Sequence, residues 1–111
     1  MRIKKSMLSY HIKQMIKSKD RDVKLDFCYK ILDMPLFVLG SYEDCDFEMS
    51  IRLLLNYISS INDNELIFHL SSVIELLYYS KLSAFKTLFD EYKDSTNPVI
   101  VDICNEYYSK L

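Results

Sequence analysis

The chain has few of the residues that form tight turns. Its 111 residues include a single glycine, Gly40, and two prolines, Pro35 and Pro98. A protein of many strands needs frequent turns with positive φ, which glycine adopts most readily. The scarcity of turn residues therefore predicts few, long elements. Half of the residues are hydrophobic and 27% are charged, as in an ordinary globular protein, and the length predicts one domain over residues 1–111.

The residues on which most enzymes and metal sites depend are scarce as well. A single glycine excludes both glycine-rich phosphate loops, GxGxxG and GxxxxGKS/T. Neither His11 nor His69 is followed at three or four positions by a carboxylate, a cysteine or another histidine, as a metal or nucleophile site would require. The cysteines, Cys28, Cys45 and Cys104, form no CxxC pair and suit reduced thiols. We therefore expect no enzymatic activity, no cofactor and no metal.

Export and membrane segments are not indicated either. The chain begins with charged residues, but no uninterrupted apolar segment follows them. No stretch approaches the roughly 18 apolar residues that a membrane-spanning helix needs. Together with the reduced cysteines, this predicts a cytoplasmic protein.

Apolar residues recur at spacings of three and four in six segments, which predicts six amphipathic helices. The first ends near Ser18, and the second begins at a cap provided by Asp20 or Asp22 and stops before Pro35. The third runs to about Ser60. The expected apolar faces of the second and third helices are Val23, Phe27, Cys28, Ile31 and Leu32, and Phe47, Ile51, Leu54, Leu55 and Ile58.

The remaining three helices follow a loop and cap at residues 62–65. The next helix has the most apolar face of the chain and is expected to be central, a further helix covers residues 82–92, and the last begins at Pro98. Residues 34–39 fit either a helical turn or an extended link. The expected apolar face of the helix after this loop is Leu66, Ile67, Leu70, Val73, Ile74 and Leu77. That of the helix over 82–92 is Leu82, Phe85, Leu88, Phe89 and Tyr92, and that of the last helix is Ile100, Val101, Cys104, Tyr107, Tyr108 and Leu111.

Short loops between these helices predict an all-α protein of about six antiparallel helices packed as helical hairpins. The segment Asn97-Pro98-Val99-Ile100-Val101-Asp102, with Cys104 and Leu111, resembles the start of the first helix of a HEAT-type repeat. Such repeats often carry a basic residue where this chain has Asp102. No second copy recurs at a fixed period, which argues against a regular solenoid.

Charge is divided unevenly along the chain. Residues 1–24 contain eight Lys or Arg and two Asp, a net of +6, whereas residues 25–111 contain six basic and fourteen acidic residues, a net of −8; together these give −2. The basic segment can bind nucleic acid or an anionic membrane, or pair with the acidic remainder of its own chain. We favour the last, because aromatic residues other than Tyr10 are not interleaved with the basic ones.

The acidic remainder contains a compact run of candidate contact residues, Tyr42, Glu43, Asp44, Asp46 and Glu48. The run lacks the glycine and ligand spacing of a calcium-binding EF-hand. It can cap the helix that follows, or it can present carboxylates and a tyrosine to a basic partner. One member each of the pairs Tyr78-Tyr79 and Tyr107-Tyr108 is expected in the core, which leaves the other for a contact surface.

In length, helical character and acidic surface, including the run from Tyr42 to Glu48, the chain resembles small α-helical immunity proteins of bacterial contact-dependent growth inhibition and related polymorphic toxin systems. The resemblance implies a cytoplasmic protein that binds and neutralises one cognate toxin domain, commonly a basic RNase or DNase. It implies partner-binding roles for Tyr42, Glu43, Asp44, Asp46, Glu48, Tyr107 and Tyr108, with no membrane and no direct nucleic-acid contact.

Two alternatives remain open. The first is another helical interaction module, such as a HEAT-like adaptor or a viral helical-bundle decoy of host signalling, which an exposed apolar groove would favour. The second is a nucleic-acid or membrane-surface binder that works through the basic residues of the N-terminal segment. These residues are Lys4, Lys5, Lys13, Lys17, Lys19, Arg21 and Lys24.

Overall fold

The computed structural model describes residues 7–81, 90–92 and 94–108, with the side chains of 99, 107 and 108 left out. All regular elements in these residues are helices, which confirms the predicted all-α class. Residues 90–92 are helical, and the rest of the helix predicted over 82–92 lies outside the described residues. The helices are α1 (Leu8–Lys17), α2 (Arg21–Leu32), α3 (Leu36–Leu39), α4 (Asp44–Ser60), α5 (Asn64–Ser80) and α7 (Pro98–Tyr108).

Short polar residues begin α2 and α5, as the sequence predicts. The carboxylate of Asp20 accepts a hydrogen bond from the amide of Asp22, and that of Asp63 accepts one from the amide of Leu66. Each bond satisfies an amide that has no partner within its own helix. Pro98 is the first residue of α7, where its missing N–H costs no helical bond.

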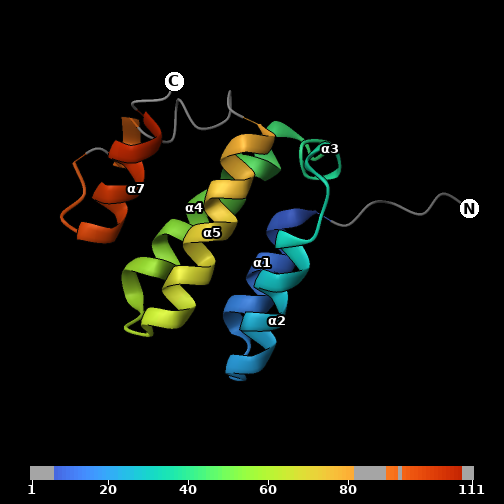
Figure 1. The fold of residues 1–111 in the computed structure, drawn as a ribbon, viewed down its shortest axis with the longest axis horizontal. Helices are drawn as coiled ribbons and strands as arrows, with labels where there is room; N and C mark the ends of the chain where they lie inside the picture. Colours follow the sequence, from blue (N-terminus) through green and yellow to red (C-terminus); the bar gives the residue numbers. More distant parts are fainter. Residues whose placement is uncertain (1–6, 82–89, 93, 109–111) are drawn as a thin grey trace, which may run out of the picture.

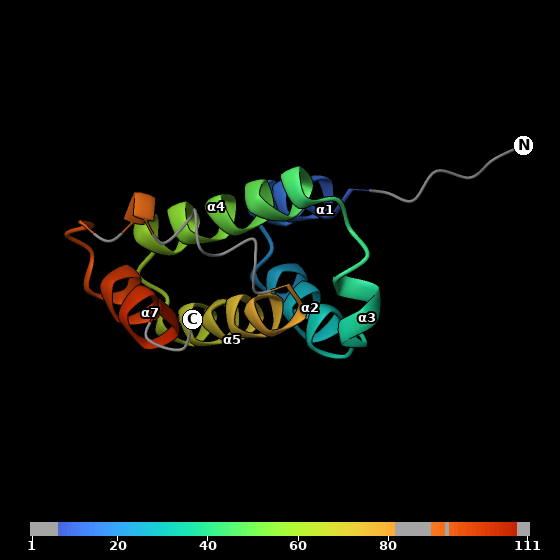
Figure 2. The ribbon, with the colours of Figure 1, turned by 90° about the horizontal axis from the view of Figure 1, so that it is seen from above.

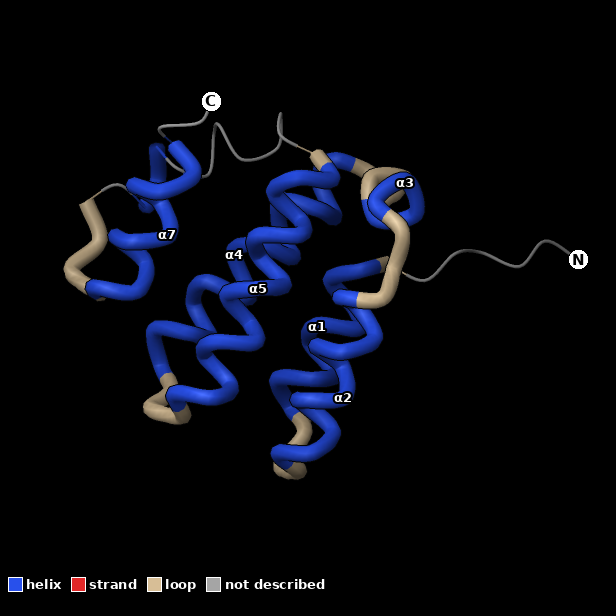
Figure 3. The backbone as a smooth tube through the Cα atoms, in the orientation of Figure 1, coloured by secondary structure: helices blue, strands red, loops and turns tan. Residues whose placement is uncertain are grey.

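The described helices form two hairpins that stand side by side (Figure 1). In each hairpin, α1–α2 and α4–α5, the two helices run antiparallel. The connecting loops lie at the same end of the molecule (Figure 3). Arg21, at the start of α2, joins these two loop regions through an ion pair with Asp63, the cap of α5, over 2.6 Å.

Seen from above, the helices lie in two layers (Figure 2). One layer holds α1 beside α4, and the other holds α2 beside α5, with α7 at the far edge (Figure 2). The hairpin α4–α5 therefore occupies the middle, between α1–α2 and α7. The position of α5 agrees with the central helix expected from its apolar face.

The central hairpin buries the face that its sequence predicts. Phe47, with its ring completely inside, anchors the start of α4. The only residue of the expected α5 face that stays partly exposed is Ile67. The core residues of these two helices are Phe47, Ile51, Leu54, Leu55, Ile58, Leu66, Leu70, Val73, Ile74, Leu77 and Tyr78.

Two predicted faces are rotated relative to the structure. In α2 the buried residues are Leu25, Cys28 and Ile31, because this side meets α5, while Val23 remains 48% exposed. In α7, Ile103 joins the core together with Ile100 and Cys104, and Val101 is only partly buried. Spacing alone places apolar residues on a helix but does not say which of two adjacent apolar strips faces the core.

The chain crosses between the hairpins through α3, a single helical turn. Residues 34–39 thus form a turn and not an extended link, although Phe37 is 79% exposed. Gly40 lies so close to the end of α5 that a Cβ atom there would be 2.8 Å from the carbonyl oxygen of Ser80. Next to Ser80, the ammonium of Lys81 donates to the carbonyl of Tyr42 over 2.7 Å. The crossover is therefore fastened to the C-terminal end of α5.

Candidate functional site

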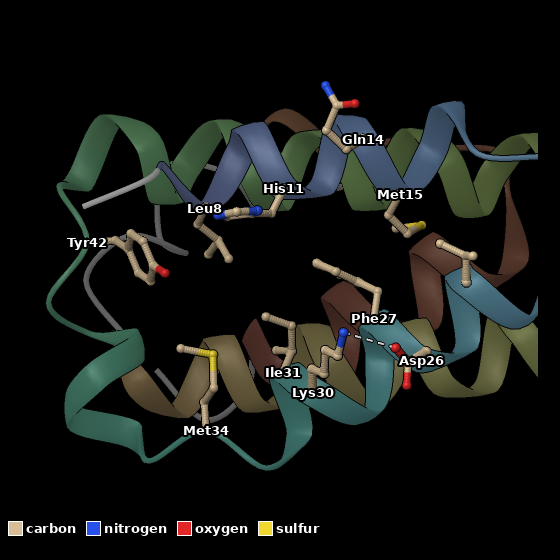
Figure 4. A pocket seen from close by; sticks show the side chains of 11 residues that line it. Leu8, His11, Gln14, Met15, Asp26, Phe27, Lys30, Ile31, Met34 and Tyr42 are labelled. Carbon is tan, nitrogen blue, oxygen red and sulfur yellow. Dashed lines mark ion pairs between the residues drawn. The ribbon is translucent and has the colours of Figure 1, made fainter. Parts of the chain in front are cut away.

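A groove of about 410 Å³ opens between α1 and α2. In Figure 4 the helix α1 forms one wall and α2 the other, and side chains from both point into the space between them. A volume of this size is typical of ligand-binding clefts. Six apolar side chains provide most of the lining: Leu8, Met15, Val23, Phe27, Ile31 and Met34.

The groove exists because the first hairpin stands at the edge of the fold. On one side α1 packs on α4 and α2 packs on α5, but among the described helices none covers the other side. Phe27 and Met34 stay half-buried there, and Val23 is 48% exposed. Two of the lining residues, Met15 and Met34, have flexible side chains that adapt to different apolar surfaces.

Polar groups stand along the rim of this groove. His11 and Gln14 come from α1, and on α2 the carboxylate of Asp26 pairs with the ammonium of Lys30 over 3.1 Å (Figure 4). At one end stands Tyr42, whose hydroxyl points into the groove (Figure 4). Burial, and to a lesser degree the nearby charge of Asp46, raises the pKa of Tyr42. The groove is therefore apolar in the middle with hydrogen-bonding groups at its borders.

Asp46 differs from its expected place on the surface. Its side chain is only 4% exposed, and its oxygens accept hydrogen bonds from the amides of Leu8 and Ser9, at 2.8 and 3.0 Å, and from the hydroxyl of Ser9. The carboxylate thus caps the start of α1, a helix 37 residues earlier in the chain. This corrects the expectation that Asp46 faces a partner, since all of these contacts are internal.

The other residues of the acidic run remain near the surface. Glu43 and Asp44 are exposed, and Glu48 is partly buried. The carboxylate of Asp44 pairs with the ammonium of Lys81 over 2.5 Å, so a basic group of a partner would have to displace Lys81 to bind it. Glu43 is the residue before α4 but makes no capping hydrogen bond with its side chain, so side-chain capping, one of the two alternatives for the run, is not observed at this position.

The predicted contact residues Tyr107 and Tyr108 end α7 in the described backbone, but their side chains lie outside the described residues. α7 packs on α4, whereas Tyr42 lines the groove on the first hairpin. Within the described residues, the predicted contact set therefore does not form one patch. Tyr42 is the member that lines the groove, and Glu43 is the exposed residue that follows it in the chain.

Among the described residues, the basic segment forms ion pairs with the acidic part of the chain at one position. Arg21 pairs with Asp63 and, over 3.2 Å, with Glu65. The hydrogen bond from Arg21 lowers the pKa of Asp63 to about 2. Lys13 and Lys17 of α1 are exposed and form no ion pair with any described residue. The expected pairing thus involves α2 and leaves the lysines of α1 in solvent.

The remaining reactive side chains lie apart from one another. No group of three or more histidines, cysteines and acidic residues among the described positions could hold a metal ion. His69 packs edge-on against Tyr29 and Phe68, with ring centroids 5.2 and 5.5 Å apart. Cys28 and Cys104 are buried and Cys45 is exposed, all as free thiols.

The sequence does not predict the groove, because the spacing of Val23 and Phe27 places both residues on the apolar face expected in the core. The available signal was an excess of apolar residues in α2, where Val23, Leu25 and Phe27 cannot all face the same side of one helix. Two apolar strips on a short edge helix are a reason to look for an open surface.

No described helix has the length and apolar character to cross a membrane. Comparisons of the chain with protein families, with curated proteins and with solved structures found no match.

Proposed function

We propose that this protein works by binding another protein, with the α1–α2 groove as the contact surface, and not by catalysis. The observation that carries this proposal is the open apolar groove between two antiparallel helices. An amphipathic helix of a partner can lay its apolar face into such a groove, which is a common mode of peptide recognition. Tyr42 at one end, and the exposed Glu43 that follows it in the chain, would then meet polar or basic groups of the partner.

In its more specific form, the proposal is that of an immunity protein that neutralises a cognate toxin domain, such as a basic nuclease. Its support is the net charge of −8 over residues 25–111, together with the exposed carboxylate of Glu43, which follows the groove residue Tyr42 in the chain. Complementary charge accelerates encounter with a basic partner. Asp46 is buried and bonded to the start of α1, so fewer carboxylates of the acidic run can bind a partner than the sequence alone indicates.

The apolar groove equally favours the broader alternative of a helical interaction module, such as an adaptor or a decoy in host signalling. The two forms differ in which contact dominates. Charge reversal at Glu43 would weaken binding of a basic toxin strongly, whereas it would change binding of an apolar helix little.

The experiment begins with the C-terminal domain of any large secreted toxin encoded immediately upstream of this gene. The two proteins are co-expressed and copurified, with wild type, Val23→Glu and Met49→Glu compared. Val23 is 48% and Met49 45% exposed, so both variants place a charge on an exposed apolar site, but only the first lies in the groove. We expect Val23→Glu to weaken binding about tenfold or more and Met49→Glu to leave it unchanged.

Equal binding of both variants would remove the groove from the interface. A second assay measures retention on heparin and on RNA as a function of salt. Tight RNA binding at physiological salt, lost steeply as salt rises and unaffected by Glu43→Lys, would replace the protein-binding proposal with nucleic-acid binding through Lys13, Lys17 and Lys19.

A further inference from the structure

A second exposed surface runs along α5, on the side that faces away from the core. We call it the α5 stripe: Glu65, Phe68, Ser72, Glu75 and Tyr79. Its members alternate at spacings of three and four, so they line up along one side of the helix over about 20 Å. Phe68 is 68% exposed and Tyr79 is 48% exposed. Phe68 thus projects into solvent. Tyr79, whose ring packs edge-on against Tyr78 with centroids 5.2 Å apart, is about half exposed on the same seam, and such a seam is the geometry with which one helix meets another.

The ring of Phe68 lies at one end of a row of three aromatic side chains. It packs edge-on against His69 with centroids 5.5 Å apart, and His69 packs in the same manner against Tyr29 of α2, with centroids 5.2 Å apart. Tyr29 is itself 50% exposed. Phe68 therefore has one aromatic neighbour and a largely exposed ring, and an aromatic side chain loses little conformational entropy on binding because it has only two rotatable side-chain bonds.

The two charged members of the stripe, Glu65 and Glu75, are both acidic, and Arg21 of α2 pairs with the first of them. From its cap Asp63 to Ser80, α5 contains three carboxylates and no lysine or arginine. Glu65 already receives the guanidinium of Arg21 over 3.2 Å, which shows that a carboxylate of the stripe can receive an arginine. Glu75 is exposed and forms no ion pair with a described residue. Glu75 and Tyr79 are four positions apart, so the carboxylate and the ring are adjacent.

We propose that the α5 stripe binds an arginine-bearing helical segment of a partner protein. A guanidinium is planar and can lie on the Tyr79 ring while it donates to Glu75, which an ammonium does less well. Phe68, about two turns from Glu75 and about three from Tyr79, would pack against an apolar side chain of the same segment. The stripe is distinct from the α1–α2 groove, because Tyr29 is about 120° around α2 from Val23. The inference rests on the proposed function only in requiring a protein partner.

The probe is a synthetic alanine-rich helical peptide with leucine and arginine at alternating spacings of three and four. Two matched peptides carry lysine or glutamate in place of arginine. Fluorescence polarisation of labelled peptide against the full chain gives Kd. We expect the arginine peptide to bind at least about tenfold more tightly than the glutamate peptide and severalfold more tightly than the lysine peptide.

Two stripe variants and three controls localise the binding. Phe68→Ala should raise Kd for the arginine peptide about tenfold, and Glu75→Gln about fivefold. Met49→Ala on α4 and Asp102→Asn on α7 change exposed residues elsewhere, and Val23→Glu changes the groove; all three should leave Kd unchanged. Because Phe68 is mostly exposed, we expect its variant to fold normally, and an unchanged circular dichroism spectrum would verify this.

The proposal is wrong if the glutamate peptide binds as well as the arginine peptide, or if Phe68→Ala has no effect. It is also overturned if sedimentation shows a dimer that Phe68→Ala dissociates, since a second copy would then cover the stripe. Loss of peptide binding in Val23→Glu alone would assign the peptide to the groove, which contradicts this inference but supports the proposed function.

Discussion

The central hairpin α4–α5 and the edge hairpin α1–α2 consist of similar amphipathic helices but bury them differently. The central pair has packed helices on both sides, and residues such as Phe47 and Leu54 are completely inside. The edge pair has a neighbour on one side only, and Val23 and Phe27 face an open groove. The comparison shows that position in the stack, more than helix sequence, decides which apolar residues are available for binding.

The two hairpins also depend on polar links to one another. Asp46 of α4 holds the start of α1, and Asp63 at the start of α5 holds Arg21 of α2. Lys81 and Gly40 fasten the crossover at the opposite end. The edge hairpin is thus attached by apolar packing and by a small number of defined polar contacts, each of which can be removed separately.

The sharpest test of the difference in burial compares Leu54→Ala with Val23→Ala. Leu54 is completely buried, so the truncation leaves a cavity and should lower the free energy of unfolding by about 2–5 kcal/mol. Val23 is 48% exposed, and its truncation should change stability by no more than about 0.5 kcal/mol. Urea unfolding followed by circular dichroism measures both. Similar losses would show that the groove is closed in solution.

The close contact between crossover and central hairpin can be tested by Gly40→Ala. The added Cβ would meet the carbonyl oxygen of Ser80 at 2.8 Å, and backbone must move to relieve it. We expect a loss of about 1–3 kcal/mol in urea unfolding. Ser59→Ala, at an exposed site on α4, is the control and should stay within about 0.5 kcal/mol. An unchanged midpoint for Gly40→Ala would mean that α3 does not rest on α5.

The attachment of α1 to α4 is tested by Asp46→Asn. An amide keeps the shape of the side chain but has one acceptor oxygen for the three donors that Asp46 serves, so we expect a loss of about 1–3 kcal/mol. Ser9→Ala removes only the hydroxyl contact and should cost about 0.5–1.5 kcal/mol. Hydrogen exchange should accelerate first in α1. Uniform acceleration across both hairpins would instead indicate that they unfold as one unit.

The smallest effect is expected at the loop end, where Arg21 pairs with Asp63. The pKa of Asp63 is lowered to about 2 from its ordinary 3.8, so the pair stabilises the fold above about pH 4 and ceases to do so as pH falls through 2. Asp63→Asn keeps the helix cap but should remove this part of the acid sensitivity. Urea unfolding from pH 6 to pH 2 measures it, with Asp102→Asn as the control. Parallel pH profiles for wild type and Asp63→Asn would contradict the pairing.

Helix positions were largely predictable from the sequence, because caps and apolar spacing are local properties. Asp20, Asp63 and Pro98 marked helix starts correctly, and the buried face of α4 was complete. The exposed groove was not predictable in this way, since it depends on which helices become neighbours. Nor was the role of Asp46, because a carboxylate that caps a helix 37 residues away has no local signature.

The sequence therefore predicts a residue at the end of the candidate site, but not the apolar residues that line it. The acidic run that begins at Tyr42 predicts Tyr42 and Glu43 as contact residues; Tyr42 lines the end of the groove, and Glu43 is exposed at the next position. Phe27 and Met34 line the groove itself, but they were assigned to the core or to a connecting segment. An apolar residue looks the same in sequence whether it is covered by its own chain or remains open to a partner.

The unequal burial of the three thiols has a practical consequence. Burial raises the pKa of Cys28 to about 11 and also raises that of Cys104, so both remain protonated and shielded near neutral pH. Cys45 is exposed and lies three residues from Tyr42 at the end of the groove. A maleimide fluorophore should thus label the native, unmutated chain at this one position, where its emission would report directly on occupancy of the neighbouring surface.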